Sequence, residues 1–119
     1  MRLAGADLGN LPEAELRGLA SKDDLPAQVE LADRQLYGKI TALDQEFVLK
    51  SFQRGSQAGI ARAHGGLADC HLWGVGMKRD NAPIIRLLEM AAEQGDPLGT
   101  YRLGWHRYYG QIVRPDRTK

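Results

Sequence analysis

The sequence predicts an all-α protein made of helix-turn-helix units that repeat every 36 residues. Three observations predict it: residues of one kind recur in columns at this spacing, glycines and an Asp-Pro pair mark where helices end and begin, and apolar residues recur at helical intervals. A fixed period of this size is the signature of a helical repeat architecture. The recurring columns are Leu31, Leu67 and Leu103; Gly38, Gly74 and Gly110; Asp44, Asp80 and Asp116; Tyr37, Trp73 and Tyr109; Leu36, Leu72 and Tyr108; and Gly59 with Gly95.

The period divides the chain into two parts. Residues 1–24 are expected to form a short capping helix, which starts near Pro12 and ends near Ala20, followed by a polar connector. Residues 25–119 are expected to form the repeat domain. Its copies span about 25–59, 60–96 and 97–119, and the third copy is truncated, which gives about two and a half repeats.

The second copy shows the pattern of the first helix most clearly. Residues 60–73 lack proline, and Ala63, Leu67, Cys70 and Trp73 recur at intervals of three or four, which places them on one helical face. Gly74 follows as the left-handed residue that commonly closes a helix. The unit is therefore expected to turn after Trp73.

The second helix of this copy has its own start signal and buried stripe. Asp80 is expected to cap its N-terminus, with Pro83 in the first turn. Its buried stripe is expected to contain Ile84, Leu87, Leu88 and Ala91. Gly95 ends this helix, and Asp96-Pro97 starts the next.

The first and third copies follow the same pattern with losses. Helices are expected over about 26–37 and 45–54 in the first copy, and over 97–109 in the third, after which the chain stops where a second helix would begin. The first copy has Gly55-Ser56 where the second has Ala91-Ala92. This difference predicts looser packing of the helix over 45–54.

These motifs resemble the Sel1-like repeat, a relative of the tetratricopeptide repeat. The resemblance rests on the string 103–110 (LGWHRYYG), on Gly74-Val75-Gly76 through Asp80, and on 91–96 (AAEQGD), and it covers residues 25–116. The resemblance implies an α-solenoid that acts as an adaptor or scaffold for protein complexes. Many members of this family are bacterial. Where the family usually places tyrosine, this chain has Gln35, His71 and Arg107.

The resemblance also implies a binding surface. Stacked first helices line the concave side in tetratricopeptide relatives, and that side receives a peptide or the edge of a partner. Trp105 stands in a column that is Asp in both other copies, which makes it the first choice for a binding residue. Carried over by position, the expected partner-binding residues are Asp33, Asp69 and Trp105, with Arg62, Tyr101 and Tyr108 nearby. Arg107 and His71 join them from the column where the family usually has tyrosine. Core packing at the end of the array is an equally open interpretation for Trp105.

Composition bounds the partners and the compartment. The formal net charge is +1, so no strong electrostatic field favours binding to nucleic acid. No stretch is long and apolar enough for membrane insertion. We expect a soluble chain, cytoplasmic by default, with a periplasmic or secreted location open if a leader has been removed. Cys70 is the single cysteine and leaves the redox compartment undetermined.

The residues predict no cofactor, no metal and no catalytic site. Cys70 and His106 share a repeat column, but no pair has the short spacing of zinc ligands. Cys70 and His71 are adjacent, so on a helix their side chains point in different directions and cannot form a catalytic pair. The chain is therefore not expected to be an enzyme.

The leading hypothesis is a protein-interaction module whose partner is a protein or peptide. A bacterial immunity (antitoxin-like) role that neutralises a secreted effector is the alternative, and an enzyme or metal-binding regulator is the third class. The truncated third copy leaves Leu103, Tyr108 and Tyr109 without the helix that would cover them, because a single helical pair cannot bury its apolar face. Three alternatives are open: residues 111–119 fold back over them, another chain covers them, or the natural protein continues. The hypothesis is a sticky C-terminal end that could self-associate.

Overall fold

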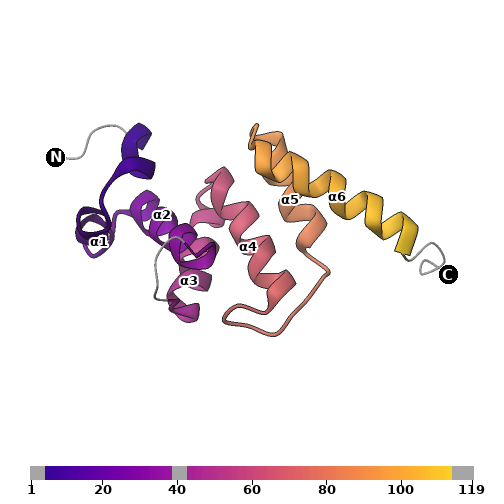
Figure 1. The fold of residues 1–119 in the computed structure, drawn as a ribbon, viewed down its shortest axis with the longest axis horizontal. Coiled ribbons are helices and arrows are strands. Elements are labelled where there is room, and N and C mark those ends of the chain that lie inside the picture. Colours follow the sequence, from indigo (N-terminus) through magenta and orange to yellow (C-terminus); the bar gives the residue numbers. More distant parts are fainter. Residues whose placement is uncertain (1–4, 39–42, 114–119) are drawn as a thin grey trace.

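The computed structural model describes residues 5–38 and 43–113, and within these residues all regular structure is helical. The elements are η1 (Gly5–Asn10), α1 (Glu13–Ala20), α2 (Leu25–Leu36), α3 (Gln45–Gln57), α4 (Ala61–Trp73), α5 (Ile84–Glu93) and α6 (Pro97–Val113). The chain extends over 54 × 27 × 23 Å, and each helix packs mainly against the helices that precede and follow it, from α1 at one end to α6 at the other (Figure 1). The prediction of an all-α chain is confirmed for these residues.

The 36-residue spacing is kept by the first helices of the units. Helices α2, α4 and α6 begin at Leu25, Ala61 and Pro97, at intervals of 36 residues. The helix ends follow the predicted chemistry in part. Gly74 closes α4 with a φ of 72°. The Asp24 carboxylate caps α2 by accepting a hydrogen bond from the Ala27 N–H, and the Asp44 carboxylate caps α3 by accepting one from the Phe47 N–H. Helix α6 continues through Gly110 to Val113, so the expected end of this helix at residue 109 is wrong and Gly110 does not close α6 as Gly74 closes α4. Asp116 lies outside the described residues.

Two local expectations need correction. Asp80 does not cap α5: its carboxylate accepts from the Ala82 backbone N–H at 3.1 Å, and α5 begins at Ile84 after Pro83. The reason is that Asp80 closes a tight turn ahead of the helix, which a short polar side chain does readily. The element η1 was not predicted, because six residues without apolar periodicity carry no helical signal.

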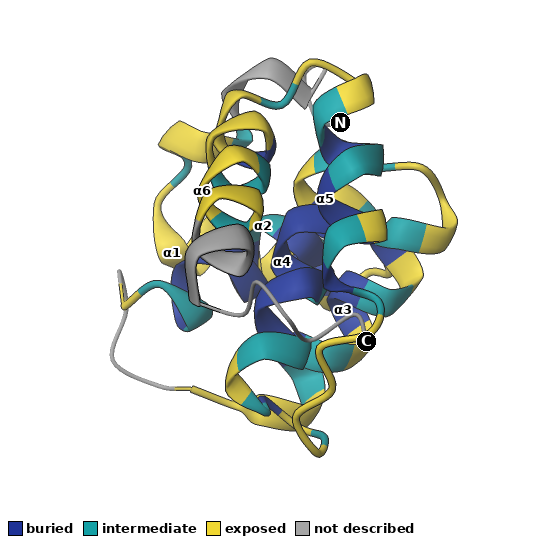
Figure 2. Cartoon of the chain, turned by 90° about the vertical axis from the view of Figure 1, so that its right-hand side faces the viewer, coloured by how far each residue is buried: buried dark blue, intermediate teal, exposed yellow. Residues whose placement is uncertain are grey.

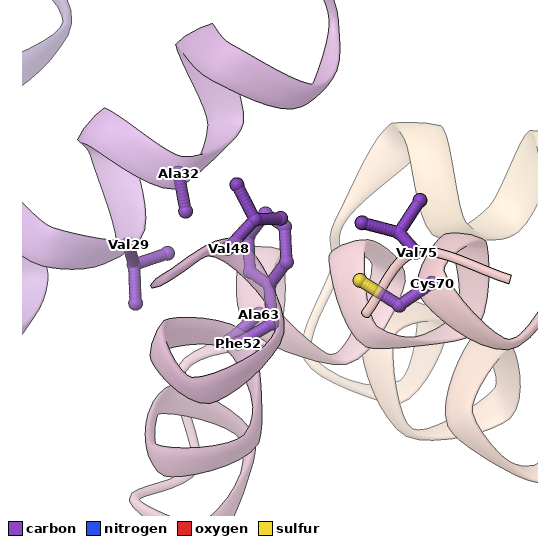
Figure 3. Packing of buried hydrophobic residues seen from close by; sticks show 7 residues of the cluster. All are labelled: Val29, Ala32, Val48, Phe52, Ala63, Cys70 and Val75. Atoms are coloured by element: carbon purple, nitrogen blue, oxygen red, sulfur yellow. The ribbon is translucent and has the colours of Figure 1, made fainter. Parts of the chain in front are cut away.

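Three apolar clusters form the core, each between consecutive helices. The central one contains Val29, Ala32, Val48, Phe52, Ala63, Cys70 and Val75, from α2, α3, α4 and the turn after α4 (Figure 3). A second cluster joins α1 to α2 through Leu16, Ala20, Ala27 and Leu31. A third joins α4 to α5 through Ala68, Ile84, Leu87 and Leu88, with Leu103 of α6 packed against it. Each amphipathic helix thus buries its apolar stripe against its neighbours in the chain.

Glycine lets the second helix of one unit approach the first helix of the next. A Cβ atom at Gly55 of α3 would lie 2.7 Å from the Ala63 Cβ atom of α4, and a Cβ atom at Gly99 of α6 would lie 2.6 Å from the Ala91 Cβ atom of α5. Positions 55 and 91 correspond in the repeat, as do 63 and 99. Each crossing therefore has room for one Cβ atom. The expectation of looser packing at Gly55 is wrong: Gly55 is buried and the crossing is tight.

Candidate partner-binding face

One face of the first helices carries polar and aromatic side-chain contacts between α2, α4 and α6. Its positions follow one another at intervals of four, three and four, which keeps them on one side of each helix. We call it the first-helix face; it consists of Pro26, Glu30, Asp33 and Tyr37 at α2, Arg62, Gly66, Asp69 and Trp73 at α4, and Leu98, Arg102 and Trp105 at α6.

Asp69 is the centre of a polar cluster that joins all three helices. Its carboxylate accepts hydrogen bonds from the Tyr37 hydroxyl and from the Arg102 guanidinium, and Arg102 also donates to the Tyr37 hydroxyl at 3.2 Å. The guanidinium carbon of Arg102 lies 5.3 Å from the centroid of the Tyr37 ring, which adds a cation–π contact. Because Asp69 is 4% exposed, these partners compensate the loss of water around its charge.

The protonation states of this cluster follow from burial and charge. Burial raises the pKa of the Tyr37 hydroxyl above its ordinary value, and the Asp69 carboxylate raises it further, so the hydroxyl keeps its proton and donates it. Burial also raises the pKa of Asp69, while the hydrogen bond from Tyr37 and the charge of Arg102 oppose that rise. The geometry favours an ionised Asp69 at neutral pH, because two donors converge on it.

A second ion pair joins α2 to α4, with its aspartate in the same repeat column as Asp69 and its arginine in a different column from Arg102. Asp33 of α2 is 2% exposed and its carboxylate lies 3.5 Å from the Arg62 guanidinium of α4. Asp33 and Asp69 were expected to line a binding surface; the structure buries both side chains, and each faces an arginine of the next first helix. The two aspartates hold neighbouring first helices together, and their arginine partners lie nearer to solvent.

Aromatic rings are the largest groups that this face exposes. Trp73 is 53% exposed and packs edge-on against Tyr37, with ring centroids 6.3 Å apart. Trp105 is 50% exposed and lies edge-on to the His106 ring at 6.3 Å. Tryptophan and arginine are the residues most often found at the centres of binding surfaces.

The other expected binding residues lie away from this face. Tyr101 and Tyr108 are 66% and 59% exposed on an adjacent side of α6. Arg107 pairs with Glu89 of α5 at 2.7 Å. His71 is half-buried; its backbone carbonyl accepts from the Asp80 N–H, and its Nδ1 atom has no hydrogen-bond partner among the described residues.

Sequence reasoning missed Tyr37, Arg102 and Trp73 as members of the site. The signal that could have found Trp73 is the spacing of 62, 66, 69 and 73, which repeats at 26, 30, 33 and 37. Arg102 gave no such signal, because its column contains Glu30 and Gly66 in the other copies.

A buried serine–histidine pair connects α3, α4 and the end of α5 by hydrogen bonds. His64 is 1% exposed; its Nδ1 atom lies 2.7 Å from Ser56 Oγ and its Nε2 atom 3.1 Å from Gln94 Nε2. Both ring nitrogens thus have hydrogen-bond partners within the fold, and the tautomer follows the orientation of the Gln94 amide. Because the ring is buried, the pair links α3, α4 and the end of α5.

Cys70 is unsuited to nucleophilic chemistry. Its side chain is fully buried, and burial raises the pKa of the thiol to about 12. A thiol rather than a thiolate is present at neutral pH, and the thiolate is the reactive species. Among the residues that the structure describes, no three His, Cys, Asp or Glu side chains converge to hold a metal ion, and no helix is long and apolar enough to cross a membrane.

Comparison with curated proteins finds a distant similarity. The chain is 28% identical over 107 residues to the chitin synthase regulator SKT5 of Saccharomyces cerevisiae, a match that covers 88% of this chain and 15% of that protein. No protein-family model matches the chain. No solved structure matches it.

Proposed function

We propose that this chain is a Sel1-like helical repeat module that binds a segment of another protein on the first-helix face, without turnover. The observation that carries the proposal is the pair of half-exposed tryptophans, Trp73 and Trp105, on neighbouring first helices. The yeast relative is a regulator of an enzyme, which supports a role in recognition rather than in chemistry.

The repeat assignment is supported by the spacing of the helices. Three first helices start 36 residues apart, and each helix packs mainly on its neighbours along an elongated molecule. In an α-solenoid, equivalent faces of successive units form one continuous surface that is suited to extended ligands. In our proposal the first-helix face is this surface.

The cluster around Asp69 prepares the face for binding. Trp73 rests on Tyr37, whose hydroxyl is held by Asp69 and whose ring lies under Arg102. A ring held in place before binding loses little conformational entropy when a ligand arrives. The two buried aspartates already neutralise Arg62 and Arg102, so apolar and aromatic contacts are expected to dominate recognition.

The test uses a peptide library displayed on phage and selected against the intact chain. Peptides that bind the unchanged chain should bind the Trp73→Ser/Trp105→Ser variant at least about tenfold more weakly, which is a loss of roughly 1.4 kcal/mol. Leu43 is 48% exposed outside this face, so Leu43→Ser is the matched control and should leave affinity unchanged. Equal binding to the double variant, or an equal loss in the control, would refute the assignment of this face.

A further inference from the structure

The turn between α4 and α5 presents two basic residues, Lys78 and Arg79, to solvent. Residues 78–82 are all exposed, and Figure 2 shows the chain between α4 and α5 mostly exposed at the lower edge of the molecule. Lys78 and Arg79 are the single pair of adjacent lysine or arginine residues in the sequence, and neither side chain has a hydrogen-bond or ion-pair partner among the described residues. With one carboxylate beside them, that of Asp80, the turn keeps a net positive charge.

Backbone contacts hold this turn against the end of α4. The Asp80 N–H donates to the His71 carbonyl at 3.1 Å, which folds the turn back over the last residues of that helix. Arg79 packs on the glycine that closes α4, since a Cβ atom at Gly74 would lie 3.1 Å from the Arg79 Cγ atom. Arg79 therefore lies beside the residue that directly follows Trp73.

Trp73 places an apolar group next to this positive charge. Its ring is 53% exposed on the first-helix face and lies edge-on to Tyr37, with ring centroids 6.3 Å apart. The arginines of that face, Arg62 and Arg102, are each paired with a buried aspartate. The face itself is thus aromatic with neutralised charges, and the turn supplies the positive charge that a ligand on Trp73 meets.

We infer that the segment recognised by this chain is acidic: one of its apolar or aromatic side chains packs on Trp73, and carboxylates close to it in sequence pair with Lys78 and Arg79. The inference rests on the proposed function, because Trp73 belongs to the first-helix face. A carboxylate that pairs with lysine or arginine makes a charge-assisted hydrogen bond. An extended chain advances about 3.3 Å per residue, so a carboxylate within about four residues of the anchor stays within about 13 Å of Trp73.

Nucleic acid, the other polyanion that basic residues attract, fits this site less well. Its affinity comes from many phosphate contacts, whereas the turn offers two cations. The formal net charge of the chain is +1, so no wider positive field supports them. An acidic peptide needs only these two contacts, because Trp73 provides the apolar anchor that such a surface requires.

The experiment uses peptides selected from the phage library on the intact chain. The selected peptides should be enriched in Asp and Glu over the unselected library. Synthetic copies should bind Lys78→Gln/Arg79→Gln at least about fivefold more weakly at low salt. This loss should shrink to within about twofold at about 0.5 M salt, because salt screens exposed charges.

Two variants serve as controls. Lys50→Gln/Arg86→Gln removes two exposed cations from the second helices with the same change in net charge, and it should leave the affinity within about twofold of the unchanged chain. Lys78→Arg/Arg79→Lys keeps both charges in the turn and should also bind normally. Unchanged urea midpoints would show that each variant is folded.

The outcomes separate this inference from the proposed function. Peptides that lose affinity for Trp73→Ser/Trp105→Ser, yet lack an excess of acidic residues and bind Lys78→Gln/Arg79→Gln normally, would overturn the inference alone. An equal loss in Lys50→Gln/Arg86→Gln would also overturn it, because long-range charge would then explain the effect. Peptides that bind the tryptophan variant normally would refute the proposed function and this inference with it. A single-stranded oligonucleotide that displaces the peptides would make nucleic acid the occupant and overturn the inference.

Discussion

The crossing of α5 and α6 provides the sharpest test of the packing. At this crossing a Cβ atom on Gly99 would lie 2.6 Å from the Ala91 Cβ atom and 3.3 Å from the Ala92 backbone nitrogen. Apolar carbon atoms normally make contact at about 3.5–4.0 Å, so Gly99→Ala forces the two helices apart by about 1 Å or distorts one of them.

The magnitude follows from two opposing effects. Overpacking a tight core site costs about 1–3 kcal/mol. Replacing glycine by alanine in a helix returns up to about 1 kcal/mol, and less here because Gly99 lies in the first turn of α6. The overlap wins, and Gly99→Ala should lower the free energy of unfolding by about 1–2 kcal/mol.

Urea unfolding followed by far-UV circular dichroism measures this change, and a double-mutant cycle identifies its cause. Because the crossing has room for one Cβ atom, Ala91→Gly/Gly99→Ala should be more stable than the sum of the single changes predicts, by at least about 1 kcal/mol. Gly18→Ala in the open part of α1 serves as the control and should not destabilise the chain. A stabilised or neutral Gly99→Ala, or additive single effects, would refute the reasoning.

Three further changes test other parts of the structure. Asp69→Ala removes the acceptor of Tyr37 and Arg102 and should lower the free energy of unfolding by about 2–4 kcal/mol in urea; a loss below about 0.5 kcal/mol would contradict the role given to this carboxylate. Burial lowers the pKa of the His64 ring from its ordinary value of 6.5, so the unfolded chain takes up this proton at a higher pH than the folded chain does. The free energy of unfolding should therefore fall as the pH drops through 6.5 toward the folded pKa. The difference in pH dependence between the unchanged chain and His64→Gln, measured by urea unfolding from pH 8 to about 5, isolates this effect, and identical slopes would exclude it. Gly104→Ala should raise the midpoint of thermal unfolding, because it adds about 0.5–1 kcal/mol of helix propensity in open space, and a decrease would indicate an unseen contact.

Much of the fold could be predicted from local patterns. The start of α4 and the stripe of α5 were readable because apolar spacing and glycine positions act within one helix and its turn. The helix start at Asp80 was misplaced, because the same short side chain can cap a helix or close a turn, and here it accepts from the Ala82 N–H ahead of α5. Trp105 was selected because its column is Asp in both other copies, with core packing left equally open, and the structure leaves it 50% exposed.

The site was predictable only in part, because burial depends on which helices face each other. Asp33 and Asp69 stood out as a polar column, yet the residues that neutralise them lie 29 and 33 positions later. Arg102 occupies a column with no common chemistry, so nothing in the periodicity selected it. The polar column of Gln35, His71 and Arg107 likewise gained meaning from contacts: Gln35 accepts from the Asp44 N–H, and Arg107 pairs with Glu89.

The sequence by itself determined that the chain is helical, that its first helices start 36 residues apart and where the apolar stripe of α5 lies, because these follow from intervals along one chain segment. Only the tertiary structure decided that Tyr37, Asp69 and Arg102 meet, and that one Cβ atom fits at each crossing of α3 with α4 and of α5 with α6. Those features depend on the distance and angle between helices. Both are set by the packing of side chains that are far apart in the sequence.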